Sequence, residues 1–82
     1  MATKIKRIEK GVWEMIANVE VDFQVTVGND LHVCEAASTP TKTTVYKVAE
    51  ARQIYNFKPT GGSKLFGYSP DETITVAYDE VQ

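Results

Sequence analysis

The sequence predicts an all-β domain, a small antiparallel β-sandwich or barrel of about six to seven strands. The clearest observation is strict alternation over residues 19–27, where odd positions are apolar and even positions are polar. A period of two is typical of a strand that buries one face. The second observation is the regular spacing of turn-forming residues, which occur at Gly28-Asn29-Asp30, Ser38-Thr39-Pro40, Pro59–Ser63 and Ser69-Pro70-Asp71.

Strand-like segments lie between these turns. Val19–Val27, the tight turn after it and Leu31–Ala37 together predict a β-hairpin. Near the end of the chain, Thr73–Asp79 alternates as clearly as the first strand of that hairpin. The remaining strands are predicted at Gly11–Ile16, Thr44–Val48, Arg52–Phe57 and Lys64–Tyr68. A single helical turn within Val45–Gln53 is the competing interpretation there, because residues 48–52 have a helix-friendly composition.

The alternation also predicts the core, and the chain length predicts how stable that core is. We expect core side chains at Val21, Phe23, Val25, Leu31, Val33, Ile74 and Val76. With 82 residues the chain forms one domain of modest stability. Its single cysteine, Cys34, excludes a disulfide within the chain, and we expect that thiol to be a small buried side chain. Oligomerisation or docking is therefore the expected additional source of stability.

Charge divides the chain into a basic N-terminal arm, residues 1–10, and an acidic β-sandwich domain, residues 11–82. The arm has four basic residues and one acidic residue, and the remainder has five basic and ten acidic residues. An acidic domain argues against nucleic acid as a partner. The arm is either a docking segment or a solubilising tail. As a docking segment it would contact its partner through Lys4, Ile5, Lys6, Arg7 and Ile8.

No residue pattern predicts catalysis, a cofactor or a metal site, so we expect a protein that is not an enzyme. Gly61-Gly62-Ser63-Lys64 lacks the residue order of a phosphate-binding loop. His32 and Cys34 stand two apart on one strand face, about 6.5–7 Å from each other, which is poor geometry for a nucleophile and its base. One histidine and one cysteine cannot supply four zinc ligands. No apolar run reaches the 18 residues of a membrane helix, so we expect no membrane partner.

Aromatic residues give the best candidates for a binding surface. Tyr55 and Phe57 share one face of a predicted strand whose other face carries Ile54. The strand that holds Phe66 and Tyr68 is also apolar on both faces. Either these strands have a second contact surface, or a neighbouring loop covers them. The first alternative makes Tyr55, Phe57, Phe66 and Tyr68 candidate partner-binding residues.

The order of these motifs resembles that of a group of small β-rich bacteriophage virion proteins. The matching motifs are a tryptophan strand (Gly11–Ile16), an alternating strand (Val21–Val25), Glu35–Pro40, Leu65–Tyr68 and the Thr-rich Thr73–Ala77. The resemblance covers roughly residues 11–80 and implies no catalytic residue.

The resemblance implies a non-enzymatic structural protein that docks on the virion. It would serve as a capsid decoration, a head fibre or a tail accessory, would be made in the host cytoplasm and would self-associate as a homo-oligomer. Its partners would be other capsid or tail proteins. Two alternatives from other classes are a module that binds carbohydrate or a host protein through surface Tyr or Trp, and a small inhibitor of a host protein.

Overall fold

Strands make up most of the part of the chain that the computed structural model describes, residues 3–42 and 46–81. This part contains no helix, and so none that could cross a membrane. The prediction of an all-β domain is confirmed. The strands are β1 (Lys4–Ile8), β2 (Glu14–Ala17), β3 (Val21–Val27), β4 (Leu31–Ala36), β5 (Lys47–Ala49), β6 (Ile54–Phe57), β7 (Lys64–Tyr68) and β8 (Ile74–Glu80).

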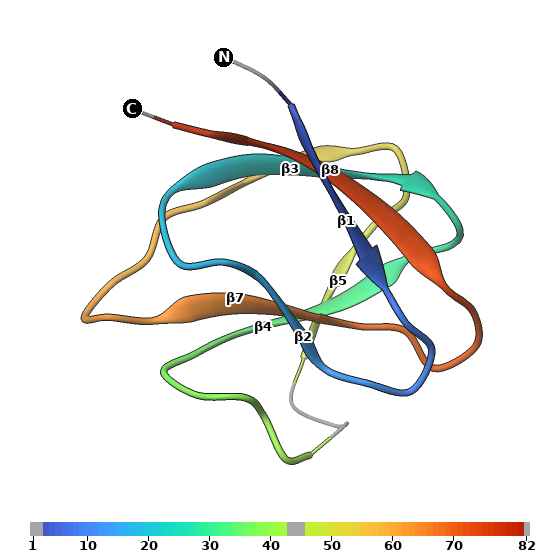
Figure 1. The fold of residues 1–82 in the computed structure, drawn as a ribbon, viewed down its shortest axis with the longest axis horizontal. Helices are drawn as coiled ribbons and strands as arrows, with labels where there is room; N and C mark the ends of the chain where they lie inside the picture. The colour runs from blue at the N-terminus through green and yellow to red at the C-terminus, as the bar shows by residue number, and fades with distance from the viewer. Residues whose placement is uncertain (1–2, 43–45, 82) are drawn as a thin grey trace.

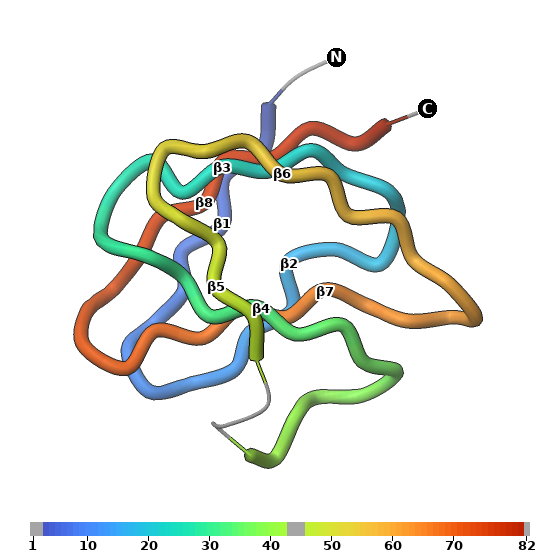
Figure 2. The backbone as a smooth tube through the Cα atoms, turned by 180° about the vertical axis from the view of Figure 1, so that it is seen from behind, coloured from blue at the N-terminus to red at the C-terminus, as the bar shows by residue number. Residues whose placement is uncertain are grey.

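The strands form two antiparallel sheets packed face to face (Figure 1). The first sheet has the order β1-β8-β3-β6, and the second has the order β2-β7-β4-β5. Strands β1 and β2 therefore lie at one side of the sandwich, and β5 and β6 lie at the opposite side (Figure 2).

The core fills the space between the two sheets, as the alternation predicts. Strands β3 and β8 run side by side at the centre of the first sheet and direct their apolar residues inward. Of the predicted core side chains, Val33 is only partly buried, although it packs against the same cluster. The others are buried, namely Val21, Phe23, Val25, Leu31, Ile74 and Val76.

The predicted hairpin of β3 and β4 is wrong, because the turn at Gly28 joins one sheet to the other. Strand β3 pairs with β6 and β8, whereas β4 pairs with β5 and β7. Turn-forming residues specify that the chain reverses, but they do not specify which sheet the next strand joins. Gly28 has a φ of 105°, and a Cβ atom there would lie 2.8 Å from Cγ1 of Ile74. The turn thus packs closely on β8.

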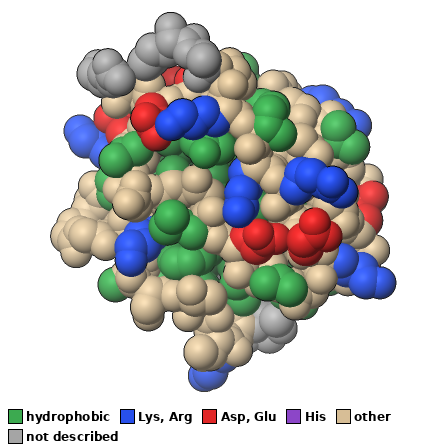
Figure 3. Space-filling model, viewed as in Figure 1, with side chains coloured by type: hydrophobic (Ala, Val, Ile, Leu, Met, Phe, Trp, Pro, Cys, Tyr) green, Lys and Arg blue, Asp and Glu red, His purple; other side chains and the backbone are tan. Residues whose placement is uncertain are grey.

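The prediction of a basic arm separate from the domain is also wrong for those of its residues that the structure describes. Strand β1 pairs with β8 along its whole length, and Ile8 is 0% exposed in the core. Two of the three cations of β1 lie beside carboxylates. Lys4 Nζ is 3.0 Å from Glu80 Oε2, and Lys6 Nζ is 3.3 Å from Glu14 Oε1 on β2. We call the side that carries β1 and β2 the closed side of the sandwich. Figure 3 shows charges of both signs intermixed there.

The competing helical turn is not formed in the described part of its range, residues 46–53. That segment contains β5 and then a turn at residues 51 and 52. The predicted strand Thr44–Val48 begins outside the described residues and is found here from Lys47 to Ala49. The other predicted strands are present with ends shifted by up to three residues.

We expect Gly28→Ala to lower the free energy of unfolding by about 2–4 kcal/mol, because it combines an unfavourable φ with a steric clash. Gly61→Ala is the matched control, since Gly61 has a φ of 62° but no atom within 4 Å of its Cβ position. The control should lose only about 1 kcal/mol. Urea denaturation measures both losses, and equal losses would show that the contact with Ile74 does not constrain the turn.

Candidate binding cleft between the two sheets

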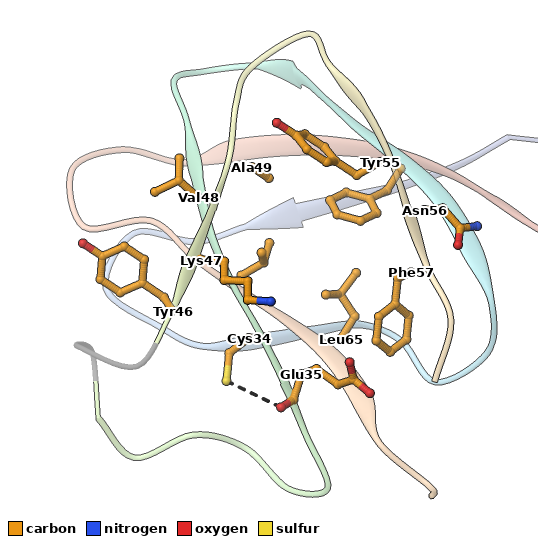
Figure 4. A pocket seen from close by; sticks show the side chains of 12 residues that line it. Cys34, Glu35, Tyr46, Lys47, Val48, Ala49, Tyr55, Asn56, Phe57 and Leu65 are labelled. Atoms are coloured by element: carbon orange, nitrogen blue, oxygen red, sulfur yellow. Dashed lines mark hydrogen bonds between the residues drawn. The ribbon is translucent and has the colours of Figure 1, made fainter. Parts of the chain in front are cut away.

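A cleft of about 560 Å³ opens between the two sheets at the side that carries β5 and β6 (Figure 4). Each of these is an edge strand, and no other described strand covers its free edge. Tyr55 and Val33, which are only partly buried against the core, can therefore be reached from this side. The apolar wall comes from Phe23, Tyr55 and Phe57 of the first sheet and from Val33 and Leu65 of the second.

Strand pairing explains why the aromatic side chains face the cleft. Tyr55 pairs with Phe23, and Phe57 pairs with Val21, so β6 directs both rings to the inner face. The Phe23 and Tyr55 rings stack with centroids 5.7 Å apart. The Tyr55 hydroxyl accepts a hydrogen bond of 2.9 Å from the backbone N–H of Glu50, in the connection between β5 and β6. This bond fixes the Tyr55 ring as a wall of the cleft.

Two charged residues stand at the mouth of the cleft. Lys47 points from β5 into the space between the sheets (Figure 4). Among the residues that the structure describes, no carboxylate lies within ion-pair distance of Lys47. Glu35 lies across the mouth, where its carboxylate accepts hydrogen bonds from the hydroxyls of Ser63 and Thr60, the latter at 3.2 Å. Glu35 is thus engaged in holding the loop before β7.

The hydrogen bond from the Ser63 hydroxyl lowers the pKa of Glu35 below its ordinary value. The bonds from Thr60 and the positive charge of Lys47 act in the same direction, while desolvation opposes them. Glu35 therefore stays ionised at neutral pH, and its charge partly balances that of Lys47.

The structure separates the aromatic residues that the sequence proposed for binding. Tyr55 and Phe57 line the cleft, although Phe57 is largely buried. Phe66 and Tyr68 lie on the outer face of the second sheet. Phe66 is only 3% exposed, so it cannot contact a partner in the folded chain.

The loop that follows β4 lies on the outer side of the second sheet. The segment from Ala37 to Lys42 runs along the outer side of the second sheet (Figure 1). The Trp13 indole N–H holds it there by donating a 3.1 Å hydrogen bond to the Lys42 carbonyl. Phe66 on β7 is not a free contact surface in the folded chain, since it is only 3% exposed. Strand β6 remains a candidate contact surface, because Ile54 on its outer face is 71% exposed.

Tyr68 belongs to a row of rings on the same outer face. Its ring centroid lies 5.2 Å from that of Trp13 and 6.3 Å from that of His32. His32 in turn stacks on Tyr46 at 3.8 Å. These rings contact one another, and the row supports the loop after β4.

The proposed docking residues of the N-terminal segment lie away from the cleft, on β1 at the far edge of the first sheet. Ile8 is in the core, which excludes it from docking, whereas Ile5 is 61% exposed. Cys34 is half-buried at the margin of the cleft, so the expectation that it is buried is wrong. Sequence reasoning missed Lys47 and Glu35, because a charged residue near a strand end is ordinarily a solvated one.

A second hollow of about 330 Å³ is bordered by several acidic residues. Two of its carboxylates already accept hydrogen bonds from the backbone. Asp30 accepts one from the N–H of Ala51 at 2.9 Å, and Glu72 accepts one from the N–H of Asn29 at 3.1 Å. These acids hold loops in place.

The arrangement of the cleft is suited to binding an apolar group beside a charge. Among residues 3–42 and 46–81, no group of three or more His, Cys, Asp or Glu side chains is placed to hold a metal ion. Comparisons with protein-family models, curated proteins and solved structures gave no match. The open side of the sandwich is therefore the feature from which a function can be inferred.

The lowered pKa of Glu35 predicts a pH dependence of stability. A depressed carboxyl pKa contributes stability that is present above the ordinary value of 4.5 and is lost as the pH falls through the lowered pKa. Glu35→Gln should therefore be less stable than the natural chain at pH 7, and the difference should narrow below pH 4.5. Urea denaturation across this range measures it, and a difference that does not change with pH would contradict the role of the Ser63 hydrogen bond.

Proposed function

We propose that this protein is a non-enzymatic assembly protein that docks by adding a partner's extended segment to the free edge of β6. Edge strands carry unpaired backbone N–H and C=O groups, which can pair with another chain. The observation that carries the proposal is that β6, although only four residues long, lacks the charges, the proline and the bulge that ordinarily prevent such pairing.

The four edge strands differ in how they are protected. Strand β1 carries three cations, β2 has a bulge between Met15 and Ala17, and β5 is only three residues long. Strand β6 has the sequence Ile-Tyr-Asn-Phe, with no charge, no proline and a regular pairing with β3. Charges, bulges and short length are the usual protections against edge pairing. Of the described edges, β6 is the one best suited to accept a strand.

The cleft beside β6 adds affinity to such pairing. Side chains alternate between the two faces of a strand, so every second residue of an added strand would face inward. Those residues would cover Tyr55 and Phe57 at the cleft. Burying one aliphatic side chain contributes up to about 1.5–3 kcal/mol. Backbone pairing and apolar burial therefore act together at this edge.

The resemblance to small phage virion proteins supports a virion as the place of assembly. We propose a capsid or tail protein as the docking partner, with synthesis in the host cytoplasm and incorporation into the particle. Without that partner, the same edge would pair with β6 of a second copy and give a homo-oligomer. An inhibitor of a host protein, the alternative from another class, could use the same edge.

A carbohydrate platform is less well supported by the geometry. Sugar-binding aromatic residues need free ring faces, but His32 and Tyr46 stack on each other, and Trp13 packs on Tyr68. The Trp13 N–H is also engaged with the Lys42 carbonyl. The row of rings therefore serves the loop that it supports.

We expect Ile54→Lys to weaken self-association while leaving the fold intact, because a lysine on an edge strand opposes pairing and Ile54 is 71% exposed. Ile5→Lys on β1 is the matched control, with an isoleucine that is 61% exposed at the opposite edge. Light scattering during size-exclusion chromatography over a range of concentrations measures association. Equal association of both variants and the natural chain would contradict docking through β6.

A further inference from the structure

We infer that the segment that adds to β6 carries an acidic side chain that pairs with Lys47, next to apolar side chains that enter the cleft. This inference rests on the proposed function and specifies the chemistry of the partner. It follows from the position of Lys47, which lies on the opposite wall of the cleft from β6.

The geometry places alternate residues of the added strand over the cleft. The strand would extend the first sheet beyond β6, with its inward side chains between β6 and β5. Tyr55 and Phe57 would form the apolar contact on one wall. Lys47, which pairs with Val33 across the second sheet, would form the polar contact on the other. The cleft thus selects a segment whose inward residues are apolar and acidic.

Of the two charged residues at the mouth, Lys47 is the one that can bind an incoming carboxylate, because the carboxylate of Glu35 already has partners within the chain. The carboxylate of Glu35 accepts hydrogen bonds from two hydroxyls, and Lys47 forms no ion pair within the described part of the chain. The Lys47 ammonium can therefore donate to a carboxylate of the partner. A charge pair that is partly shielded from water at an interface changes affinity by about tenfold or more.

A second copy of the chain satisfies this site less well. If two β6 strands paired with each other, each would present Ile54, Tyr55, Asn56 and Phe57, none of which is acidic. Both Lys47 side chains would then lie near the interface without a carboxylate from the other copy. Charge complementarity thus favours a different protein as the natural occupant, and self-pairing as the weaker alternative.

A titration of the isotopically labelled full-length protein with short capped peptides tests the inference by nuclear magnetic resonance. The first peptide, Thr-Glu-Thr-Val-Thr-Leu-Thr, puts one acidic and two apolar side chains on the same face. The second has Lys in place of Glu, and the third is the first peptide with its backbone nitrogens methylated, so that it cannot pair as a strand. We expect the acidic peptide to shift the amide signals of β6 and to bind at least about tenfold more tightly than the Lys peptide. The methylated peptide should not bind.

Two lysine variants test whether the preference for the acidic peptide comes from the charge of Lys47. Lys47→Met keeps the aliphatic stem and should remove the preference for the acidic peptide. Lys10→Met should retain the preference, because Lys10 is exposed beside Ser69 between β1 and β2 and does not line the cleft. If the two unmethylated peptides bind equally at β6, the inference of an acidic side chain that pairs with Lys47 is wrong, but the proposal of strand addition to β6 still holds. If the methylated peptide binds as well as its parent, if the shifts lie away from β6, or if no peptide binds, the proposed function is wrong as well.

Discussion

The structure depends on the burial of one face of the central strand pair, β3 and β8, against the second sheet. In this pair Val25 lies opposite Val76 and Phe23 lies opposite Tyr78, so one uninterrupted apolar surface faces inward. Strand β1 adds to the outer edge of β8, and β6 adds to the outer edge of β3. A domain this small has a single core, and the other strands are positioned by their contacts with the sheets that enclose it.

The two sides of the sandwich are closed to different degrees. At the β1 side, Ile8 enters the core, and the ion pair of Lys6 with Glu14 joins the edges of the two sheets. At the β6 side, the three residues of β5 are too few to cover the inner face of the first sheet. Tyr55 and Phe23 therefore line a cleft as well as a core. The difference in strand length at the two edges leaves the cleft open on this side.

The sequence predicted those features that depend on local patterns. Strict alternation identified β3 and β8, and through them most of the core. The pairing of β3 with β8 could not be predicted, because Gly28 signals a reversal of the chain and does not identify the next neighbour. Strand β1 was mistaken for an arm because its cations hid Ile8, the single residue of that segment that is fully buried.

The candidate site was predicted in part, for a similar reason. Tyr55 and Phe57 were selected because their strand is apolar on both faces. Phe66 has the same pattern, but it is only 3% exposed in the folded chain, and the sequence pattern does not reveal this burial. Lys47 has no distinguishing signal in the sequence, since its place at the cleft depends on how the two sheets pack.

Amide hydrogen exchange in dilute and concentrated solutions tests most directly whether β6 is the docking edge. In a dilute solution, those β6 amides that point away from β3 should exchange quickly, because they have no partner in the described structure. In a concentrated solution they should become protected, while the amides at the free edges of β1, β2 and β5 should not change. Protection that increases at one of those three edges, or at none of the four, would contradict the account.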